Sequence, residues 1–280
     1  TQAIGVVTLG TSDGKQSIPE IIELYGTRGF GVIAITDHVS EEKTLIGKAA
    51  IHMGLSLTEA TFPLYSEILA SEAERAWKQY KMIVLKGFEL SKNSISNHRS
   101  AHVLGLGIKN LMMADADIPE LIRGIKEQGG LAIAAHPVAS GKIEKQTYHL
   151  WDRREELASQ FDAWEVASGS ILFQEVARTK LPKIASSDMH IARQMQSWKT
   201  LFQCEKHPEA ILEAIRKQQI DFRFYEEAPN VFGHRVVLPL VSDMPANPVW
   251  NPARGVEHPE RETQWPAIVP HTPHFYPQTA

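Results

Sequence analysis

Residues 33–38 of the chain have the sequence IAITDH, a short apolar run that ends in an acid and an imidazole. Similar endings occur at residues 83–89 (IVLKGFE), 132–137 (AIAAHP) and 184–190 (IASSDMH). Short apolar runs bounded by polar residues are typical of buried strands in parallel sheets. We therefore expect four buried strands, each followed at its carboxyl end by His, Asp or Glu.

Strand-like and helix-like segments alternate through the first 228 residues. The predicted strands are Ala3–Leu9, Gly31–Thr36, Met82–Leu85, Val103–Gly107, Leu131–Ala135, Phe161–Val166, Lys183–Ser186 and Phe222–Tyr225. The predicted helices are Ile18–Gly29, Thr58–Tyr80, Ile118–Gly130 and Glu209–Gln218. Repeated strand–helix–strand order predicts an α/β fold of parallel units, and about seven repeats favour a barrel over an open sheet.

Composition excludes several classes of protein. The chain has 280 residues, a formal net charge of −4 and 43% hydrophobic residues, which is ordinary globular composition. The slightly acidic balance argues against a protein dedicated to duplex nucleic acid. No apolar run approaches the roughly 20 residues of a membrane helix, and no signal peptide is seen. Cys204 is the single cysteine, so no intrachain disulfide can form, and we expect a cytoplasmic protein.

Proline divides the chain into two parts. Ten of the 16 prolines lie in residues 229–280, where little helical or strand period is present. We therefore expect a barrel domain over residues 1–228 and a Pro-rich C-terminal extension over residues 229–280. Aromatic residues in the extension favour contact with the domain or with a neighbouring subunit, which makes it a candidate for homo-oligomer formation.

The polar residues at the strand ends point to a metal site. In β/α barrels the carboxyl ends of the strands meet at one rim, where reactive side chains gather. Carboxylate and imidazole groups suit Zn²⁺, Mn²⁺ or Fe²⁺ in hydrolytic sites. Several acids and histidines at one rim are costly to bury without a partner. A metal-free hydrogen-bonded network is the alternative.

Together these runs resemble the PHP (polymerase and histidinol phosphatase) superfamily of metal-dependent phosphoesterases. The matching segments, in family order, are Ser12-Asp13-Gly14, Ile35-Thr36-Asp37-His38, Gly87-Phe88-Glu89, His102 before Val-Leu-Gly, Ala135-His136-Pro137 and Ser187-Asp188-Met189-His190. The resemblance covers about residues 1–226. It implies a distorted (β/α)7 TIM-like barrel, two or three divalent metal ions and hydrolysis of phosphate esters.

Carried over by position, the resemblance also implies roles for single residues. The implied metal ligands are Asp13, His38, Glu89, His102, His136, Asp188 and His190, with Glu89 bridging two ions. The residues expected to take part in catalysis are Asp37, His38, Asp188 and His190. His102 differs from the others because it precedes its apolar run, and His98 lies nearby.

The chain departs from the family pattern at its first strand. The expected His-x-His falls on Val6-Val7-Thr8, and neither flanking residue replaces an imidazole as a ligand. Three readings follow: an enzyme that works with two metals, a degenerate member that binds metal or ligand without hydrolysis, or N-terminal residues that differ from those of the native protein.

The remaining predictions concern the substrate. Arg193 and Lys199 follow the Asp188–His190 segment and could bind a phosphate. The expected substrate is a small phosphorylated compound or a short oligonucleotide. An amidohydrolase acting on C–N bonds is a third candidate, for which Lys86 is the only weak candidate for a carbamylated lysine. Glu165 lies near the end of a predicted strand, but no motif assigns it a role.

Overall fold

A computed structural model of the chain describes residues 4–6, 8–9, 16–96, 99–138 and 148–227. The strands are β1 (Ile4–Val6), β2 (Thr8–Leu9), β3 (Val32–Ser40), β4 (Ile83–Lys92), β5 (Ala101–Leu106), β6 (Leu131–Ala134), β7 (Ala163–Ser168), β8 (Ile171–Leu172), β9 (Lys183–Ser186), β10 (Trp198–Phe202) and β11 (Ile220–Phe224). The helices are α1 (Ile18–Gly26), α2 (Leu45–His52), α3 (Phe62–Tyr80), α4 (Ile118–Glu127), α5 (Tyr148–Asp152), α6 (Arg154–Leu157), α7 (Gln174–Ala177), α8 (Pro208–Arg216) and the 3-10 helix η2 (Ala192–Met195). None of the described helices is both long and apolar enough to cross a lipid bilayer.

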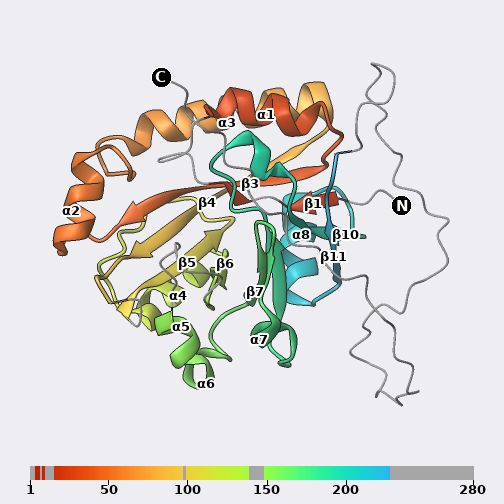
Figure 1. The fold of residues 1–280 in the computed structure, drawn as a ribbon. Helices are drawn as coiled ribbons and strands as arrows, with labels where there is room; N and C mark the ends of the chain where they lie inside the picture. The colour runs from red at the N-terminus through yellow and green to blue at the C-terminus, as the bar shows by residue number, and fades with distance from the viewer. Residues whose placement is uncertain (1–3, 7, 10–15, 97–98, 139–147, 228–280) are drawn as a thin grey trace, which may run out of the picture. The chain divides into compact units, whose positions relative to one another are not determined.

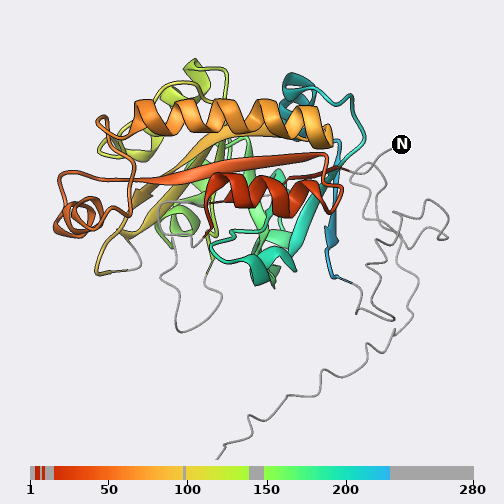
Figure 2. The ribbon, with the colours of Figure 1, turned by 90° about the horizontal axis from the view of Figure 1, so that it is seen from above.

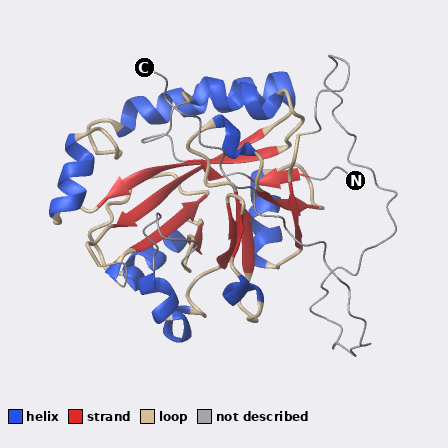
Figure 3. Cartoon of the chain, viewed as in Figure 1, coloured by secondary structure: helices blue, strands red, loops and turns tan. Residues whose placement is uncertain are grey.

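The main sheet contains the strands that carry or precede the predicted site residues. Its order is β2-β3-β4-β5-β6-β7-β8, and β9 pairs with β7. The pairs β2–β3, β3–β4, β6–β7 and β7–β9 are parallel, as the alternation of strands and helices predicts. The sheet curls (Figure 1), and Figure 3 shows its strands at the centre with helices around them.

One strand breaks the parallel pattern that the sequence predicts. β5 runs antiparallel to both of its neighbours, β4 and β6. The reason is the length of the connection, because only residues 93–100 join β4 to β5. A crossover to a parallel strand needs about a dozen residues or more, whereas a short connection returns the chain antiparallel.

A second, smaller sheet has the order β1-β10-β11 and is antiparallel throughout. The single strand predicted over Ala3–Leu9 is thus divided, since β1 pairs with β10 and β2 pairs with β3. Within the described residues no strand pairing joins β9 back to β2. Instead, Thr200 Oγ1 of β10 hydrogen-bonds with the N–H and the C=O of Ala185 in β9, at 3.0 and 2.8 Å. The predicted distorted (β/α)7 barrel is therefore not confirmed in full, and the structure shows a curled α/β sheet.

The two faces of the main sheet pack against different helices. Successive strand residues point to opposite faces. On the convex face, residues such as Ile35 and Phe88 pack with apolar residues of α1, α3 and α4. On the concave face, Ala34 and Leu85 belong to a separate buried cluster that includes Ile211 of α8. A polar residue in β3 or β4 therefore lies either on the convex face, under the helices, or on the concave face, depending on whether it is in step with Ile35 and Phe88 or with Ala34 and Leu85.

Helices α1 and α3 lie side by side over the convex face of β3 and β4 (Figure 2). Their close approach depends on Gly26, because a Cβ there would lie 2.2 Å from the Tyr80 ring. The Tyr80 hydroxyl donates a hydrogen bond of 2.6 Å to Glu23 Oε2, which adds a polar link between the two helices. This packed layer holds the strands that carry the candidate site.

Candidate metal centre

His38 and Glu89 lie opposite each other on neighbouring strands. They are partners in the parallel register of β3 and β4. His38 lies an even number of residues after Ala34 in β3, and Glu89 an even number after Leu85 in β4. Both side chains therefore point to the concave face. His38 Nδ1 lies 3.9 Å from Glu89 Oε2 and 2.8 Å from Ser91 Oγ. Strand pairing alone therefore brings together two of the predicted ligands.

The antiparallel direction of β5 explains the position of His102. In a parallel sheet, a residue before its apolar run would lie at the opposite end from Glu89. Because β5 runs the other way, its first residues pair with the last residues of β4, and His102 faces Ser91 in the register. His102 Nδ1 lies 2.6 Å from Glu89 Oε1. The feature that sets His102 apart in the sequence is thus a consequence of strand direction.

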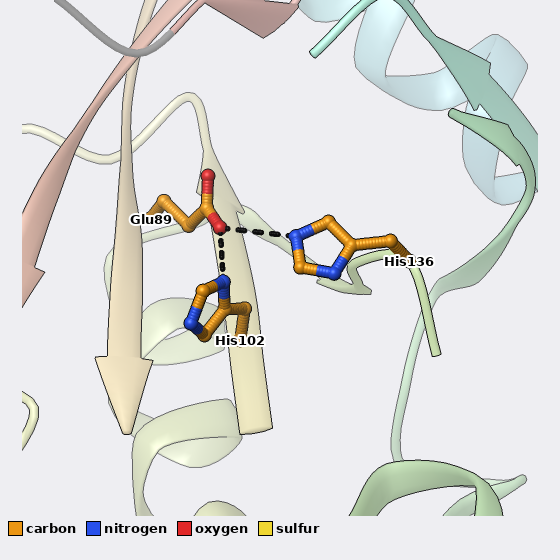
Figure 4. Close-up of side chains that lie close together, drawn as sticks. All are labelled: Glu89, His102 and His136. Atoms are coloured by element: carbon orange, nitrogen blue, oxygen red, sulfur yellow. Dashed lines mark hydrogen bonds and ion pairs between the residues drawn. The ribbon is translucent and has the colours of Figure 1, made fainter. Parts of the chain in front are cut away.

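His136 completes a cluster around one carboxylate oxygen. It follows β6, and its Nε2 lies 3.3 Å from Glu89 Oε1. Figure 4 shows both imidazoles directed at that oxygen from different sides. The ligand atoms of Glu89, His102 and His136 all lie within 4.8 Å of one another, close enough to share one metal ion. The chain therefore carries a His/Glu cluster suited to a divalent metal.

Burial and charge act against each other in this cluster. Burial raises the pKa of Glu89, but the neighbouring imidazoles outweigh it and hold the pKa well below the usual value. Burial lowers the pKa of His102. Burial also acts to lower the pKa of His136, but the hydrogen bond and charge of Glu89 raise it to about 10. Without metal, Glu89 is thus an anion stabilised by a protonated His136.

The donor atoms fit a cation better than they fit one another. His102 Nδ1 is buried and has no hydrogen-bond partner among the described residues, although it lies 2.6 Å from Glu89 Oε1. His102 Nδ1 and Glu89 Oε1 thus lie close together without forming a hydrogen bond, as two atoms do when both coordinate the same metal ion. On the far side of the ring, Nε2 lies 3.0 Å from Asn93 Oδ1, which orients the imidazole.

Two further predicted ligands lie beside this cluster. The His190 ring stacks on the His38 ring with a centroid distance of 6.1 Å. His190 Nδ1 lies 3.8 Å from Asp188 Oδ1. Gln194 Oε1 accepts hydrogen bonds of 2.7 and 2.9 Å from the backbone N–H groups of His190 and Ile191. The segment after β9 therefore places His190 beside His38, which in turn lies next to Glu89.

Asp37 does not lie on the face that carries the cluster. Its side chain is on the same face of β3 as those of Ile35 and Val39, which pack under the helices. Tyr65 of α3 lies near it, and the pKa of Tyr65 is raised well above the usual value, first by burial and then by the negative charge of Asp37. The predicted catalytic role of Asp37 receives no support from this position, because an acid one residue before His38 in a strand faces the other way.

Lys199 is also placed differently from the prediction. It is buried, and its Nζ donates hydrogen bonds to the carbonyl oxygens of Met195 and Ser197, at 2.8 and 3.2 Å, and to Ser197 Oγ at 2.5 Å. Burial lowers the pKa of Lys199 to about 7. This lysine binds backbone groups, a placement that does not support its predicted role as a phosphate contact. Arg193 is exposed, and its predicted role stays a prediction.

The N-terminal ligands cannot be placed. Asp13 lies outside the described residues. The backbones of Val6 and Thr8 belong to β1 and β2, whereas their side chains lie outside the described part of the chain. The readings that rest on the missing His-x-His therefore stay open.

Sequence reasoning missed the importance of Glu165. It is 1% exposed, and its Oε2 accepts a 2.6 Å hydrogen bond from the backbone N–H of His136. Its Oε1 accepts a hydrogen bond from the Ser186 hydroxyl. Burial raises the pKa of Glu165 to about 7, against the opposing effect of His136. The signal available in the sequence was an acid within an otherwise apolar strand.

Comparisons with known proteins agree with this architecture. No protein-family model matches the chain, and no curated protein matches it. A two-domain protein from Bacteroides vulgatus that contains a PHP-like metal-dependent phosphoesterase has a similar structure, with a TM-score of 0.57 and 16% identity. The alignment covers 80% of this chain and 65% of that one, so the chain spans less than two thirds of its length. At this identity the likeness shows a shared fold.

Two other solved structures match more loosely. They are an amidohydrolase from Chromobacterium violaceum with bound sulfate and a candidate metal-dependent phosphoesterase from Bifidobacterium adolescentis. Their identities are 15% and 13%, each has a TM-score of 0.41, and each alignment covers 66% of this chain and 87% of the other. At these values they carry no argument about this chain.

Proposed function

We propose that the chain is a phosphoesterase that works with two or three divalent ions, of which Zn²⁺, Mn²⁺ and Fe²⁺ suit the ligands. The observation that carries the proposal is the buried Glu89 carboxylate, with His102 and His136 at one oxygen and His38 at the other. A carboxylate flanked in this way can bridge two ions. The residues that would hold the ions are Glu89, His102 and His136 for one, Asp13, His38 and His190 for another, and Asp188 for a third.

The chain's own residues prepare the site for this chemistry. When bound, close divalent ions lower the pKa of a water molecule and neutralise the oxygens of a phosphoryl group. Asn93 and Ser91 orient the rings of His102 and His38 through hydrogen bonds of 3.0 and 2.8 Å. The His190 ring stacks beside His38. The His190 side chain is 28% exposed, so a substrate can approach the site from solvent on this side.

The substrate that we propose is a small phosphorylated compound or a short oligonucleotide. A net charge of −4 does not favour duplex nucleic acid. Arg193 follows His190, is exposed and supplies a guanidinium that can form paired hydrogen bonds with a phosphate. The Pro-rich extension remains our candidate for contacts between subunits.

A non-catalytic metal-binding protein is the second candidate, and Val6 and Thr8 favour it. They stand where the PHP pattern has imidazole ligands, so one ion of the cluster loses part of its coordination. The amidohydrolase reading is weaker. Lys86 lies on the convex face with Phe88, and its Nζ donates hydrogen bonds to Ser66 Oγ and the carbonyl of Lys109, at 3.1 and 2.6 Å. It is thus directed away from Glu89.

The experiment that separates these candidates measures metal content and hydrolysis on the same preparation. The full chain is purified without chelator, its Zn, Mn and Fe are measured by elemental analysis, and hydrolysis of p-nitrophenyl phosphate and bis-p-nitrophenyl phosphate is followed. We expect about two ions per chain and metal-dependent hydrolysis of one of these esters.

Matched variants make the result specific. His136→Ala is expected to lower metal content and rate together, whereas His52→Ala, which removes an exposed imidazole at the end of α2, is expected to change neither. Metal without hydrolysis of any phosphate ester would favour the non-catalytic candidate. Full activity in His136→Ala would contradict the phosphoesterase assignment.

A further inference from the structure

Glu165 lies behind the metal cluster and joins three segments of the sheet. It belongs to β7, its Oε2 accepts from the backbone N–H of His136 after β6, and its Oε1 accepts from Ser186 at the end of β9. Its hydrogen bond to the site is made to the main chain of a ligand residue. Its charge also acts on the His136 imidazole.

The backbone of His136 needs such support. Its φ is 25°, in the left-handed region that residues with a Cβ rarely adopt. The next residue is Pro137, which biases the residue before it toward extended backbone. A conformation opposed by both effects persists only where surrounding contacts determine it. The 2.6 Å hydrogen bond from the His136 N–H to Glu165 is such a contact.

The chemistry of this position argues against a purely packing role. A carboxyl group that is 1% exposed costs free energy to bury, and an apolar side chain of the same length would fill the strand without that cost. The neighbours of Glu165 in the concave cluster, Ala163 and Ile184, are apolar. What the carboxylate adds is two acceptor oxygens, one for the strained histidine and one for β9.

We propose that Glu165 is a positioning residue that holds His136 in its left-handed conformation, so that Nε2 faces Glu89. The inference rests on the proposed metal site and deepens it. The bond to Ser186 extends the effect, because Ser186 lies two residues before Asp188, whose own φ is 43°. One buried acid thus links β7 both to the segment that carries His136 and to the end of β9.

Glu165→Met is the variant that separates positioning from packing. Methionine keeps the length of the side chain, removes both acceptor oxygens and removes a buried ionisable group. Zn²⁺ is titrated into the metal-free full chain by calorimetry, and urea unfolding of the metal-free chain is measured in parallel. We expect Zn²⁺ affinity to fall about 10- to 100-fold, the range for residues behind a metal ligand. The urea midpoint is expected to stay unchanged or to rise.

Two further variants sharpen the test. Ser186→Ala removes the other hydrogen bond of Glu165 and leaves the one to His136, so its Zn²⁺ affinity is expected to stay within about threefold of the wild type. Glu165→Gln keeps one acceptor oxygen and is expected to recover most of the affinity lost in Glu165→Met. If the methionine variant does not fold, Glu165→Leu, which also removes both acceptor oxygens, serves as the test variant. Wild-type Zn²⁺ affinity in Glu165→Met, or in Glu165→Leu where it replaces that variant, together with an unchanged His136 amide, would overturn the inference.

Amide hydrogen exchange at His136 distinguishes failure of this inference from failure of the proposed function. The His136 N–H is expected to be protected in the metal-free wild type and to exchange faster in Glu165→Met. If the wild type binds no Zn²⁺, the proposed function fails, and the exchange result still decides whether Glu165 holds His136. Unchanged exchange in Glu165→Met would refute the positioning role, whether or not metal binds.

Discussion

The two sides of the candidate centre are built in different ways. On one side, Glu89, His102 and His136 have side chains that are 6%, 12% and 14% exposed, and strand pairing between β4, β5 and β6 brings them together. On the other side, the Asp188 and His190 side chains are 31% and 28% exposed and lie on one short segment after β9.

The difference lies in what holds each side. The first side depends on pairing between different strands, which is buried and cooperative. The second depends largely on local hydrogen bonds, such as those from His190 and Ile191 to Gln194. We infer that the Glu89 side is the preformed part of the centre.

The strongest test of this comparison is Glu89→Ala. Glu89 contacts an imidazole through each of its oxygens, so its loss removes a ligand from both sides and leaves His136 without its counter-ion. We expect loss of nearly all bound metal and a fall in rate of more than about 100-fold, the upper end for residues behind a ligand. Elemental analysis and hydrolysis rates measure the two effects.

The control for this variant is Glu67→Ala, which removes an exposed carboxylate from α3 and is expected to leave metal content unchanged. Retention of wild-type metal content in Glu89→Ala would show that the ions are held elsewhere.

His190→Ala tests the independence of the second side. The contacts of Glu89 with His102 and His136 do not involve His190. We therefore expect the variant to lose about one ion, to keep the other, and to lose about 10- to 100-fold in rate. Metal stoichiometry measured by titration of the metal-free variant gives the answer. Loss of every ion would show that the two sides form one cooperative unit, contrary to the comparison.

The pH dependence of stability tests the charge pairing on the first side. The pKa of His136 is raised to about 10 by Glu89, against a usual value of 6.5. A base with a raised pKa in the folded state contributes stability that is complete below pH 6.5 and is lost as the pH rises through about 10. We expect the metal-free chain to lose on the order of 1–3 kcal/mol over this window, the value of a hydrogen bond to a charged group.

Urea unfolding of the metal-free chain at several pH values from 6 to 10.5 measures this loss. His136→Ala provides the reference, because the contribution of the imidazole is absent from it at every pH. Parallel curves for the two proteins would show that Glu89 and His136 are not paired in the metal-free chain.

Local patterns in the sequence were sufficient to predict most strands and the residues at their ends. Apolar runs before His136 and Asp188 mark β6 and β9, and the helix predicted over Ile118–Gly130 contains α4. Such signals act within a few residues, so a single sequence contains them. They also account for the correct expectation that Glu89 and His136 belong to one cluster.

The relations between distant segments could not be predicted in the same way. The direction of β5, and with it the place of His102, follows from the short connection after β4, which a repeat-based reading overlooks. The sequence predicts Asp37 as a site residue because it lies beside His38, whereas strand alternation places it on the opposite face of the sheet. An acid in an apolar strand marks Glu165 as unusual, but its role depends on a hydrogen bond from the backbone of a different strand end, which local sequence does not encode.

The smallest expected effect concerns Lys199, which supports the second side from behind. Its Nζ donates to the carbonyls of Met195 and Ser197, directly after the turn that holds His190. Lys199→Met removes these bonds without touching a proposed ligand, so metal content and KM are expected to stay within about twofold of the wild type. Unsatisfied carbonyls are expected to lower stability at pH 6 by about 1 kcal/mol.

The same substitution carries a pH signature of opposite sign to that of His136. The pKa of Lys199 is lowered by burial to about 7, from 10.5, so between these values the unfolded chain binds more protons than the folded chain. The wild type therefore gains stability from this lysine as the pH rises from 7 to 10.5. Urea unfolding of Lys199→Met over this range should lack the gain, so its deficit relative to the wild type should widen with pH. A KM for a phosphate ester that rises tenfold in this variant would instead return Lys199 to the substrate site, and would mean that the second side opens further than the structure shows.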